Sequence, residues 1–446
     1  TYLGLFSLQH RGQESSGMAV TDGRQLRLHK GTDLVQKVFS EEALDSLKGS
    51  AAIGHVRYST TGSNLLENAQ PLVVDSVFGQ VALAHNGNLT NSAQLRSRLT
   101  ASGSVFTTTT DTELIVNLMA QQKGDLETAL VAAAQQLDGA FALVALTRDR
   151  LLGLRDPLGF RPLVLGARAD GYILASESCA LSNLGAEVLR EIEPGEMVII
   201  DREGVRFRRY AEREREAFCV FEYVYFARPD SELLDQSVHQ VRKRIGRALW
   251  QEAPVEADVV IAAPDSGTPA AMGFAEASGL PFEIGLLKNR YIGRTFIEPS
   301  QQLRELGVRI KLNPIESVIR GKRVVIIDDS IVRGTTSAKI VRLLKETGAR
   351  EVHMYAASPP YLYPCYYGID TSQGTDLVAA KYKVEEIRRL IGADTLRYLS
   401  VDGLVSAVGL PSERLCLACF NGDYPLPVLG VTSKHCFEQE GEADGE

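Results

Sequence analysis

The sequence predicts a layered α+β fold for the first half of the chain and an α/β fold with a parallel sheet for the second half. In the first half, short strand-like segments follow one another through hairpin signals, without a strand–helix–strand rhythm. In the second half, buried apolar strands alternate with helical segments, as they do in doubly wound parallel sheets. The change follows a solvated charge run at 211–216, where we expect a domain boundary.

The elements of the first half can be placed one by one. Asp22 and Gly23 separate two strand-like runs and predict a type I′ hairpin. Helices are expected at about 90–101 and 111–136. Further strands are expected at 51–59, 80–87, 140–147 and 198–207.

The second half begins with a long predicted helix over 231–253. Strands and helices then alternate, and a ligand is expected at the carboxyl ends of the strands. The predicted strands lie at 257–267, 281–287, 322–330 and 351–358, and the helices between them at 270–279 and 336–349.

Length and charge exclude several classes of protein. A chain of 446 residues with 44% hydrophobic content favours two or three domains. A formal charge of −8 argues against broad binding to nucleic acid, which depends on phosphate neutralisation. The apolar runs fall far short of the roughly 20 residues that a membrane helix needs, and we find no secretion signal. We therefore expect a cytoplasmic protein.

A candidate phosphate site lies at 324–337, VVIIDDSIVRGTTS. Four β-branched residues form a buried strand that ends at two adjacent carboxylates, Asp328 and Asp329. Arg333, Gly334 and a Thr-Thr-Ser run follow and open a helix, where backbone N–H groups are unpaired and can bind phosphate. An isolated acid pair is more often a solvated strand end, but the complete run favours a ligand site.

This run resembles the phosphoribosyl pyrophosphate signature of type I phosphoribosyltransferases. The resemblance implies that the acid pair contacts ribose hydroxyls and the shell of a Mg²⁺ ion, while the turn amides bind the 5′-phosphate. The segment APDSG at 263–267 matches the pyrophosphate loop, so Ser266 would join Asp328 and Asp329 around Mg²⁺. The residues expected to bind phosphoribosyl pyrophosphate are Asp265, Ser266, Gly267, Lys288, Arg290, Asp328, Asp329, Arg333, Gly334, Thr335 and Thr336.

A basic segment lies between these two loops, at 288–311. Its six cations outnumber Glu298 and Glu305, which gives a local charge of +4 in an acidic protein. Length and sign favour a lid that closes over pyrophosphate rather than an ordinary solvated loop. The cations are Lys288, Arg290, Arg294, Arg304, Arg309 and Lys311.

The first half carries a second constellation, in HRGQESSG, GHVRYST, HNGNL and DTE. Asn86 and Gly87 offer a side-chain amide and a backbone N–H, the two donors that an oxyanion hole requires. Arg57 and Asp111 offer opposite charges suited to the α-carboxylate and α-ammonium of an amino acid. Taken singly, each motif is typical of a turn or a cap.

In this order, the motifs resemble the N-terminal-nucleophile (Ntn) glutamine amidotransferases, and the chain as a whole resembles the glutamine phosphoribosylpyrophosphate amidotransferases. The resemblance implies an αββα Ntn hydrolase domain at 1–215, a type I phosphoribosyltransferase domain at 216–420 and a tail at 421–446, whose acidic end we expect to be disordered. Ammonia from glutamine would pass through a closed channel to C1 of phosphoribosyl pyrophosphate and give 5-phosphoribosylamine, the entry step of purine synthesis. The family also implies a homotetramer or homodimer and feedback inhibition by purine nucleotides.

Four of the six cysteines match one branch of this family. Cys416 and Cys419 form a C-x₂-C pair, which alone suggests a zinc or redox site. Together with Cys219 and Cys365 they match the contexts of the family's iron–sulfur branch, which implies a [4Fe–4S] cluster. Spacing alone leaves a four-cysteine zinc site open.

The start of the chain departs from the family pattern. Family members carry a catalytic cysteine at the mature N-terminus, on a strand before the helix that leads to HRGQE, and its α-amine is the base. Thr1 lies only ten residues before Arg11, too close to replace it. We expect the segment with the nucleophilic cysteine to be missing, and the chain as given to use ammonia but not glutamine.

Three other interpretations are weaker. A sugar-phosphate amidotransferase shares the first domain, but its second half would be an isomerase without IIDDSIVRGTT. A regulator that senses phosphoribosyl pyrophosphate would keep the fold without catalysis, and a DNA-binding one would show a basic surface. The third interpretation is a degenerate paralogue. Ammonia-dependent release of pyrophosphate separates an enzyme from a sensor.

Overall fold

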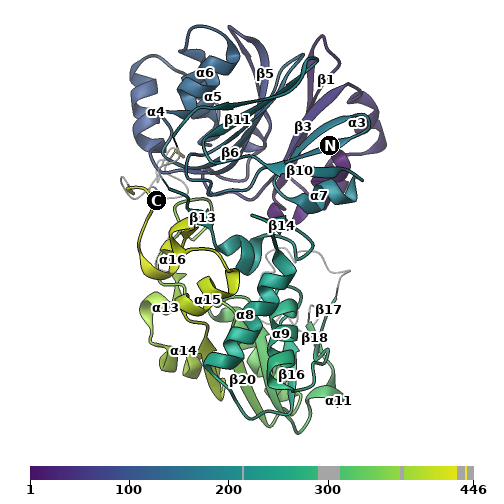
Figure 1. The fold of residues 1–446 in the computed structure, drawn as a ribbon, viewed down its shortest axis with the longest axis vertical. Helices are drawn as coiled ribbons and strands as arrows, with labels where there is room; N and C mark the ends of the chain where they lie inside the picture. Colours follow the sequence, from purple (N-terminus) through teal and green to yellow (C-terminus); the bar gives the residue numbers. More distant parts are fainter. Residues whose placement is uncertain (213–214, 290–311, 372–375, 429–436, 439–446) are drawn as a thin grey trace, which may run out of the picture.

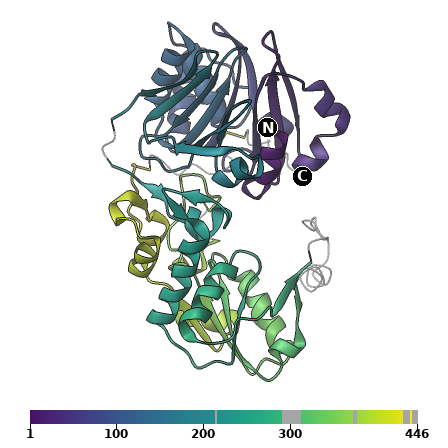
Figure 2. The same ribbon diagram turned by 45° about the vertical axis from the view of Figure 1, so that its right-hand side comes forward.

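The computed structural model describes residues 1–212, 215–289, 312–371, 376–428 and 437–438. The two halves of the chain form two bodies, one above the other in Figure 1. Figure 2, turned by 45°, shows the same separation, with the parallel sheet confined to the lower body. The change of rhythm in the sequence therefore corresponds to a change of architecture.

The first half contains a six-stranded antiparallel sheet with the order β12-β11-β7-β6-β5-β4. Two three-stranded sheets, β2-β1-β3 and β10-β8-β9, pack against one face of it. The strands are β1 (Ser15–Thr21), β2 (Leu26–Gly31), β3 (Ala51–Arg57), β4 (Leu72–Ser76), β5 (Gly79–Leu89), β6 (Gly139–Leu146), β7 (Leu151–Arg155), β8 (Val164–Arg168), β9 (Gly171–Ala175), β10 (Glu187–Glu191), β11 (Glu196–Asp201) and β12 (Gly204–Arg209).

Alternation along the central strands builds the layers. Phe141 and Leu143 of β6 face the helices on one side, while Ala142 and Val144 face the three-stranded sheets on the other. Small residues such as Ala82 at the sheet–sheet contact allow close packing. The helices outside the six-stranded sheet are α4 (Ser92–Ala101), α5 (Thr112–Ala120) and α6 (Leu126–Ala134).

Short helices cover the three-stranded sheets from the other side, which completes an αββα arrangement. Leu5 of α1 packs with Met18 and Val56 of the sheet. These helices are α1 (Tyr2–Ser7), α2 (Val35–Val38), α3 (Glu41–Ser46) and α7 (Ser178–Asn183), with one-turn 3₁₀ helices η1 (Gln9–Arg11) and η2 (Leu66–Asn68). The predicted Ntn-type fold is confirmed for this half.

The second half is built on a four-stranded parallel sheet, β16 (Val259–Ala262), β19 (Arg323–Asp328), β20 (Glu351–Ala356) and β21 (Thr395–Tyr398), in that order. Its strands are apolar on both faces because helices cover both faces. Helices α8 (Val238–Glu252), α9 (Thr268–Ser278) and α15 (Val401–Val408) pack on one side, and α12 (Thr335–Glu346) and α14 (Val384–Ile391) on the other.

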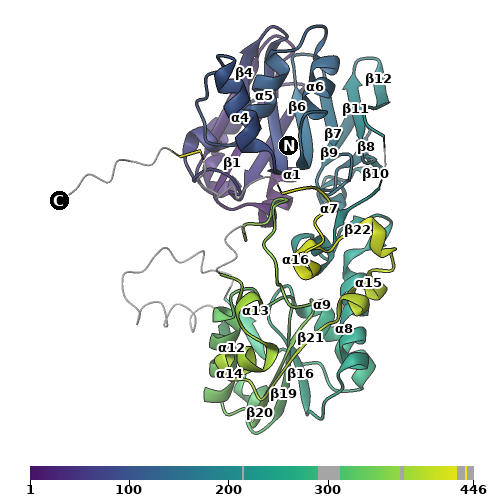
Figure 3. The same cartoon turned by 90° about the vertical axis from the view of Figure 1, so that its left-hand side faces the viewer.

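Smaller elements join the two halves. Strands β13 (Phe218–Cys219) and β22 (Leu415–Cys416) pair in parallel, and a π-helix η3 (Glu222–Phe226) follows β13. Figure 3 shows α16 (Ala418–Asn421) and β22 where the two halves meet. The remaining elements are β14 (Glu232–Leu233), β15 (Gln236–Ser237), β17 (Leu286–Lys288), β18 (Leu312–Pro314), α11 (Glu316–Ile319), α13 (Val378–Lys381) and η5 (Ser412–Arg414).

Most predicted strands are confirmed, but two predicted helices are wrong in extent. The helix over 111–136 is two helices, because Gly124 adopts a left-handed φ of +105° between α5 and α6. The helix over 231–253 begins only at Val238, since residues 232–237 form the small hairpin β14–β15. Leu234 and Asp235 at its turn both have positive φ.

Two further expectations need correction. The first hairpin is present, but its last pair is Thr21 and Leu26, so the loop has four residues instead of the two of a type I′ turn. The Asp22 side chain closes this loop by accepting from two backbone N–H groups. The segment 281–287 contributes only one bridge to the parallel sheet and otherwise forms the separate β17–β18 pair.

In the part of the chain that the structure describes, we find no helix with the length and apolar character needed to cross a bilayer. The acidic end expected to be disordered, 439–446, lies outside the described residues.

Candidate active site

Two loops follow neighbouring parallel strands and face each other at the carboxyl edge of the second sheet. The loop after β16 carries 263–267, and the loop after β19 carries 328–334. A Cβ on Gly267 would lie 2.3 Å from the backbone oxygen of Ile327, so only glycine lets the first loop pack against β19. Both predicted motifs therefore lie at the strand ends, where a ligand is expected.

The acid pair lies between these loops. Asp329 is buried and accepts hydrogen bonds from the hydroxyls of Ser266 and, at 2.7 Å, Ser330. Burial and the neighbouring Asp329 raise the pKa of Asp328 well above its usual range. Two carboxyl groups held this close favour either a proton or a cation between them.

The loop after β19 ends in a helix N-terminus. Gly334 has a φ of +76° and precedes α12, whose first residues are Thr335 and Thr336. Together with the acid pair they line a cavity of about 800 Å³ that also contains Ser266 and Arg333. This cavity offers backbone N–H donors, hydroxyls and carboxylates to one ligand.

The structure describes only some of the cations predicted to bind phosphoribosyl pyrophosphate. Lys288 pairs with Asp265 at 2.9 Å, and Arg333 pairs with Asp376 at 2.9 Å; all four side chains are largely exposed. Arg290 and the other cations of the predicted lid lie outside the described residues.

The glutamine motifs lie together around the C-terminal end of β5. Gly87 has a φ of +144°, and a Cβ there would lie 1.9 Å from the backbone oxygen of Ala140, so only glycine fits. The Nδ2 atom of Asn86 is buried and has no hydrogen-bond partner within the described structure. An unpaired amide donor beside a glycine backbone is the arrangement that an oxyanion hole requires.

Arg57 and Asp111 lie close to these donors, and both are buried. The Arg57 guanidinium donates to the carbonyls of Thr61, at 2.8 Å, and Ser63, at 2.9 Å. Burial opposes ionisation of Asp111, but His85, whose Nδ1 lies 3.5 Å away, and the Leu89 N–H hold its pKa below the usual value.

One cavity of about 380 Å³ connects the two sets of residues. Its wall includes Asn86, Gly87 and Asp111 from the first half and Asp329 and Ser330 from the second. The sequence motifs thus line one cavity at the junction of the halves.

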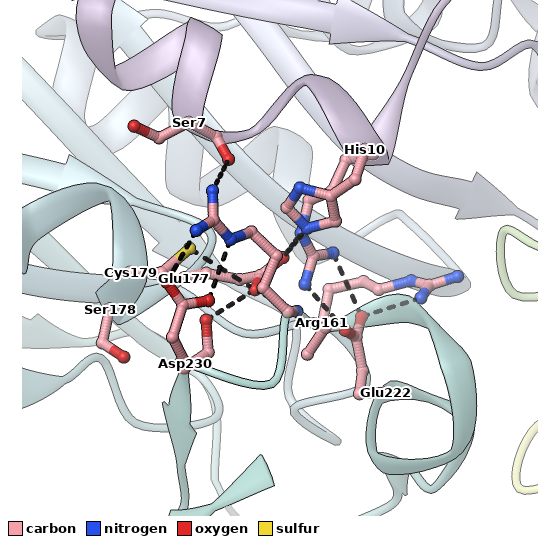
Figure 4. A network of polar contacts seen from close by, with 12 residues as sticks. Ser7, His10, Arg161, Glu177, Ser178, Cys179, Glu222 and Asp230 are labelled. Atoms are coloured by element: carbon pink, nitrogen blue, oxygen red, sulfur yellow. Dashed lines mark hydrogen bonds and ion pairs between the residues drawn. The ribbon is translucent and has the colours of Figure 1, made fainter. Parts of the chain in front are cut away.

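A buried ion-pair network surrounds this junction, and the sequence did not reveal it (Figure 4). The Arg11 guanidinium pairs with Glu177 at 2.5 Å and with Glu222 at 2.7 Å, and Arg161 donates to Glu222 at 3.1 Å. Burial would raise the pKa of Glu177, but Arg11 and His10 outweigh it and hold that pKa well below the usual range. Glu222 comes from the second half, so this network joins the halves.

The four predicted cysteines come from three separate segments and gather at the same junction. Cys219 and Cys416 are opposite each other in the β13–β22 pair. Burial first, and then the neighbouring thiols of Cys416, Cys365 and Cys219, raise the pKa of Cys419 well above its usual range. All four are free thiols.

Among the described residues, no three histidine, cysteine or acidic side chains are arranged closely enough to hold a metal ion. Cysteine sulfur is the ligand that iron–sulfur clusters and structural zinc use, so the four thiols match such a site in residue type. Cys179, which matched no ligand motif, lies beside Glu177, away from this group; Cys436 lies outside the described residues.

A separate groove of about 990 Å³ runs between the two three-stranded sheets of the first half. Its walls are β3 and β9. In the part of the chain that the structure describes, each is an edge strand of its sheet. The floor of the groove includes Ala142 and Val144. Thr1 lies at this groove, and Asn86 also lines it. The groove is bordered by two strand edges and leads to the oxyanion donors.

The fold and the sites define a class of enzyme in which a glutamine amidotransferase unit is joined to a phosphoribosyltransferase unit. Residues 55–183 match the family model described as "Glutamine amidotransferase domain", and residues 231–358 match "Phosphoribosyl transferase domain". The chain belongs to the amidophosphoribosyltransferase family. It is 50% identical over 439 residues to the amidophosphoribosyltransferase of Bacillus subtilis, covering 97% of this chain and 92% of that one. It is 51% identical over 434 residues to that of Archaeoglobus fulgidus, covering 96% and 95%.

Solved structures agree with this assignment. A glutamine phosphoribosylpyrophosphate amidotransferase from B. subtilis, complexed with ADP and GMP, superposes with a TM-score of 0.93 at 49% identity, covering 98% of this chain and 96% of that one. A structure described as the allosteric regulatory enzyme of purine biosynthesis gives 0.94 at 49% identity, covering 98% and 95%. A sugar isomerase in the second half is excluded.

Proposed function

We propose that this chain catalyses the reaction of glutamine, phosphoribosyl pyrophosphate and water to 5-phosphoribosylamine, glutamate and pyrophosphate, the first step of purine synthesis. The observation that carries the proposal is the single cavity lined by both Asn86 and Asp329. Ammonia released in the first half would reach the second half through this space without entering bulk solvent.

In the glutamine site, Arg57 binds the α-carboxylate and Asp111 the α-ammonium. Asn86 Nδ2 and the Gly87 N–H stabilise the tetrahedral oxyanion, and the unpaired state of the Asn86 amide supports this role. Asp111 is held ionised beside His85, as ammonium binding requires.

In the phosphoribosyl site, Gly334, Thr335 and Thr336 bind the 5′-phosphate at the start of α12, and Asp328 and Asp329 bind the ribose hydroxyls. The loop residues Asp265, Ser266 and Gly267 receive the pyrophosphate. Lys288, Arg290 and Arg333 supply positive charge, and the segment 288–311 acts as the lid. Each role rests on the match of sequence and, for the described residues, on their place around one cavity.

Mg²⁺ fits the chemistry of this cavity because Ser266, Asp328 and Asp329 all line it and carry hard oxygen donors. When bound, the ion neutralises pyrophosphate as it leaves C1. The acid pair and the lid cations orient the substrate and exclude water.

Cys219, Cys365, Cys416 and Cys419 would hold a [4Fe–4S] cluster. The proposal is supported by four free thiols that gather from three segments, three of them buried. Such a cluster would tie the end of the second half to the β13 segment and so stabilise the junction.

A nucleophile that attacks glutamine must lie beside Asn86, and the groove between β3 and β9 passes this residue. The groove has a free strand edge on each side and passes Asn86, so a strand paired there would carry its first residue to the oxyanion donors. An added segment that begins with a cysteine and pairs along this groove would bring a thiol to Asn86, and the experiment below tests whether it supplies glutamine hydrolysis.

Three further assignments, on domain bounds, on regulation, and on localisation and assembly, complete the proposal. The halves correspond to domains at 1–215 and 216–420, with a tail at 421–446. Purine nucleotides inhibit the enzyme, which is supported by the ADP and GMP in the B. subtilis complex. The enzyme is a cytoplasmic homotetramer or homodimer.

The decisive experiment measures pyrophosphate release from phosphoribosyl pyrophosphate with Mg²⁺ and either ammonia or glutamine. We expect release with ammonia from the chain as given, and release with glutamine once a segment starting with a processed cysteine precedes Thr1. No release with ammonia would overturn the enzymatic assignment and favour a sensor. Glutamine hydrolysis that depends on Thr1, abolished in Thr1→Ala, would overturn the assignment of the nucleophile.

A further inference from the structure

The oxyanion donors of the glutamine half touch a short segment of the other half, residues 366–368. Asn88 Nδ2 donates to the backbone oxygen of Tyr366 at 3.0 Å. Gly368 packs against Gly87 so closely that a Cβ on Gly368 would lie 3.1 Å from the Gly87 carbonyl carbon. The contact therefore lies directly at the turn that carries the oxyanion donors.

This segment is held by side-chain contacts on both sides of the junction, from Phe160 and Arg161 of the first half and from Leu426 of the tail. The Tyr367 ring stacks on Phe160 with centroids 4.4 Å apart, and its hydroxyl donates to Leu426 at 2.9 Å. The Tyr367 carbonyl accepts from Arg161 at 2.9 Å. A firmly held support is what a precisely placed donor needs, since small displacements weaken catalysis.

Gly87 is confined within its own half as well. A Cβ on Gly87 would lie 1.9 Å from the carbonyl oxygen of Ala140 on β6. The Gly87 backbone is therefore in close contact both with β6 of its own half and with Gly368 of the other half.

We propose that residues 366–368 are positioning residues for the oxyanion hole, so that the glutamine site is complete only when the phosphoribosyl half is docked against it. This inference rests on the proposed roles of Asn86 and Gly87. Residues 366–368 follow Cys365 directly in the chain. Three residues therefore connect one of the four thiols to the contact with the oxyanion donors.

The test compares Gly368→Ala with Gly124→Ala. Both glycines have nearly the same φ, +104° and +105°, so a side chain at either position meets the same unfavourable φ. The new Cβ at Gly368 would meet Gly87 at 3.1 Å and Arg161 Nη2 at 2.8 Å, whereas at Gly124 the nearest atoms lie 3.9 Å away. Only the first variant pushes on the oxyanion turn.

Two measurements follow. In the chain that carries the cysteine-bearing segment, we expect Gly368→Ala to lower kcat for glutamine hydrolysis about tenfold or more, since loss of a whole oxyanion donor costs about 10²–10³. KM for glutamine and ammonia-dependent synthesis should match Gly124→Ala, because Arg57, Asp111 and the phosphoribosyl cavity are untouched. In the chain as given, hydrogen exchange of peptides covering 85–89 should accelerate in Gly368→Ala alone.

A second variant removes the contact without adding bulk. Asn88→Ala loses the bond to Tyr366 and the hydrogen bond that the Thr61 hydroxyl donates to Asn88 Oδ1, so Thr61→Val serves as its control. Beyond the effect of that control, its effect on kcat should not add to that of Gly368→Ala, since both act through the contact with residues 366–368. Glutamine hydrolysis within about twofold of the Gly124→Ala rate, or a raised KM with normal kcat, overturns the proposal. If the enzyme without substitutions releases no pyrophosphate with ammonia, the proposed function is overturned instead.

Discussion

Replacement of Glu222 by glutamine tests whether the buried ion pairs hold the two halves together. The Glu222 side chain is fully buried and accepts three hydrogen bonds, two from Arg11, at 2.7 and 3.2 Å, and one from Arg161, at 3.1 Å. The Arg11 and Arg161 side chains are only 9% and 2% exposed, so water cannot replace the lost carboxylate.

The magnitude follows from these contacts. Removing one partner of a buried ion pair costs about 3–5 kcal/mol, because the other charge stays buried. A glutamine oxygen in the place of Oε1 can still accept two of the three hydrogen bonds, so one charge-assisted bond, worth about 1.5–3 kcal/mol, is lost and the amide group faces the donor that Oε2 accepted from. Since the positive charge that remains buried adds to this loss, we expect Glu222→Gln to lower the free energy of unfolding by about 3–5 kcal/mol.

Glu276→Gln is the matched control. Glu276 also has two cationic partners, Lys243 and Arg247, but its side chain is 46% exposed, where ion pairs contribute about 0–1 kcal/mol. Urea unfolding of both variants should be followed by circular dichroism and by fluorescence of Trp250, the single tryptophan, which lies on α8. Equal losses in the two variants would refute the argument from burial.

Three further predictions concern the sites. Asp329→Asn should lower ammonia-dependent pyrophosphate release more than about a hundredfold while leaving the melting temperature within a few degrees, since its partners are hydroxyls; near-normal release would contradict its role. Gly87→Ala should abolish glutamine hydrolysis and spare ammonia use, because the new Cβ would lie 1.9 Å from Ala140 O; retained hydrolysis would show that the oxyanion hole is elsewhere. Anaerobically purified protein should be brown, with about four irons per chain by elemental analysis; colourless protein with one zinc would refute the cluster but keep the thiol site.

Where a candidate site is carried by one contiguous run, the sequence was sufficient to predict the elements that build it. The run that ends at Asp328 and Asp329 contains strand, acid pair, glycine turn and helix start in order, so local rules alone predict the ligand site. The same holds for Asn86 and Gly87, which are neighbours in the chain. The structure placed both runs as expected.

Local rules failed where a tertiary contact overrode the pattern. Residues 231–237 have helical periodicity, yet Leu233 is buried in the core beneath α8 and the chain turns at Leu234 and Asp235 instead. Residues 111–136 are divided at Gly124, whose positive φ no helical pattern shows. Hydrophobic spacing does not distinguish one long helix from two shorter ones.

The sequence by itself therefore determined the two architectures, the phosphate loop and the chemical identity of each candidate donor, because these depend on neighbours within a few residues. Only the tertiary structure decided what those donors face. Arg11, Arg161 and Glu222 are separated by up to 211 residues yet share one buried network, and Gly368 lies against Gly87 from the other half of the chain. The physical reason is that burial and charge pairing act between surfaces brought together by folding, and no local pattern records which surfaces meet.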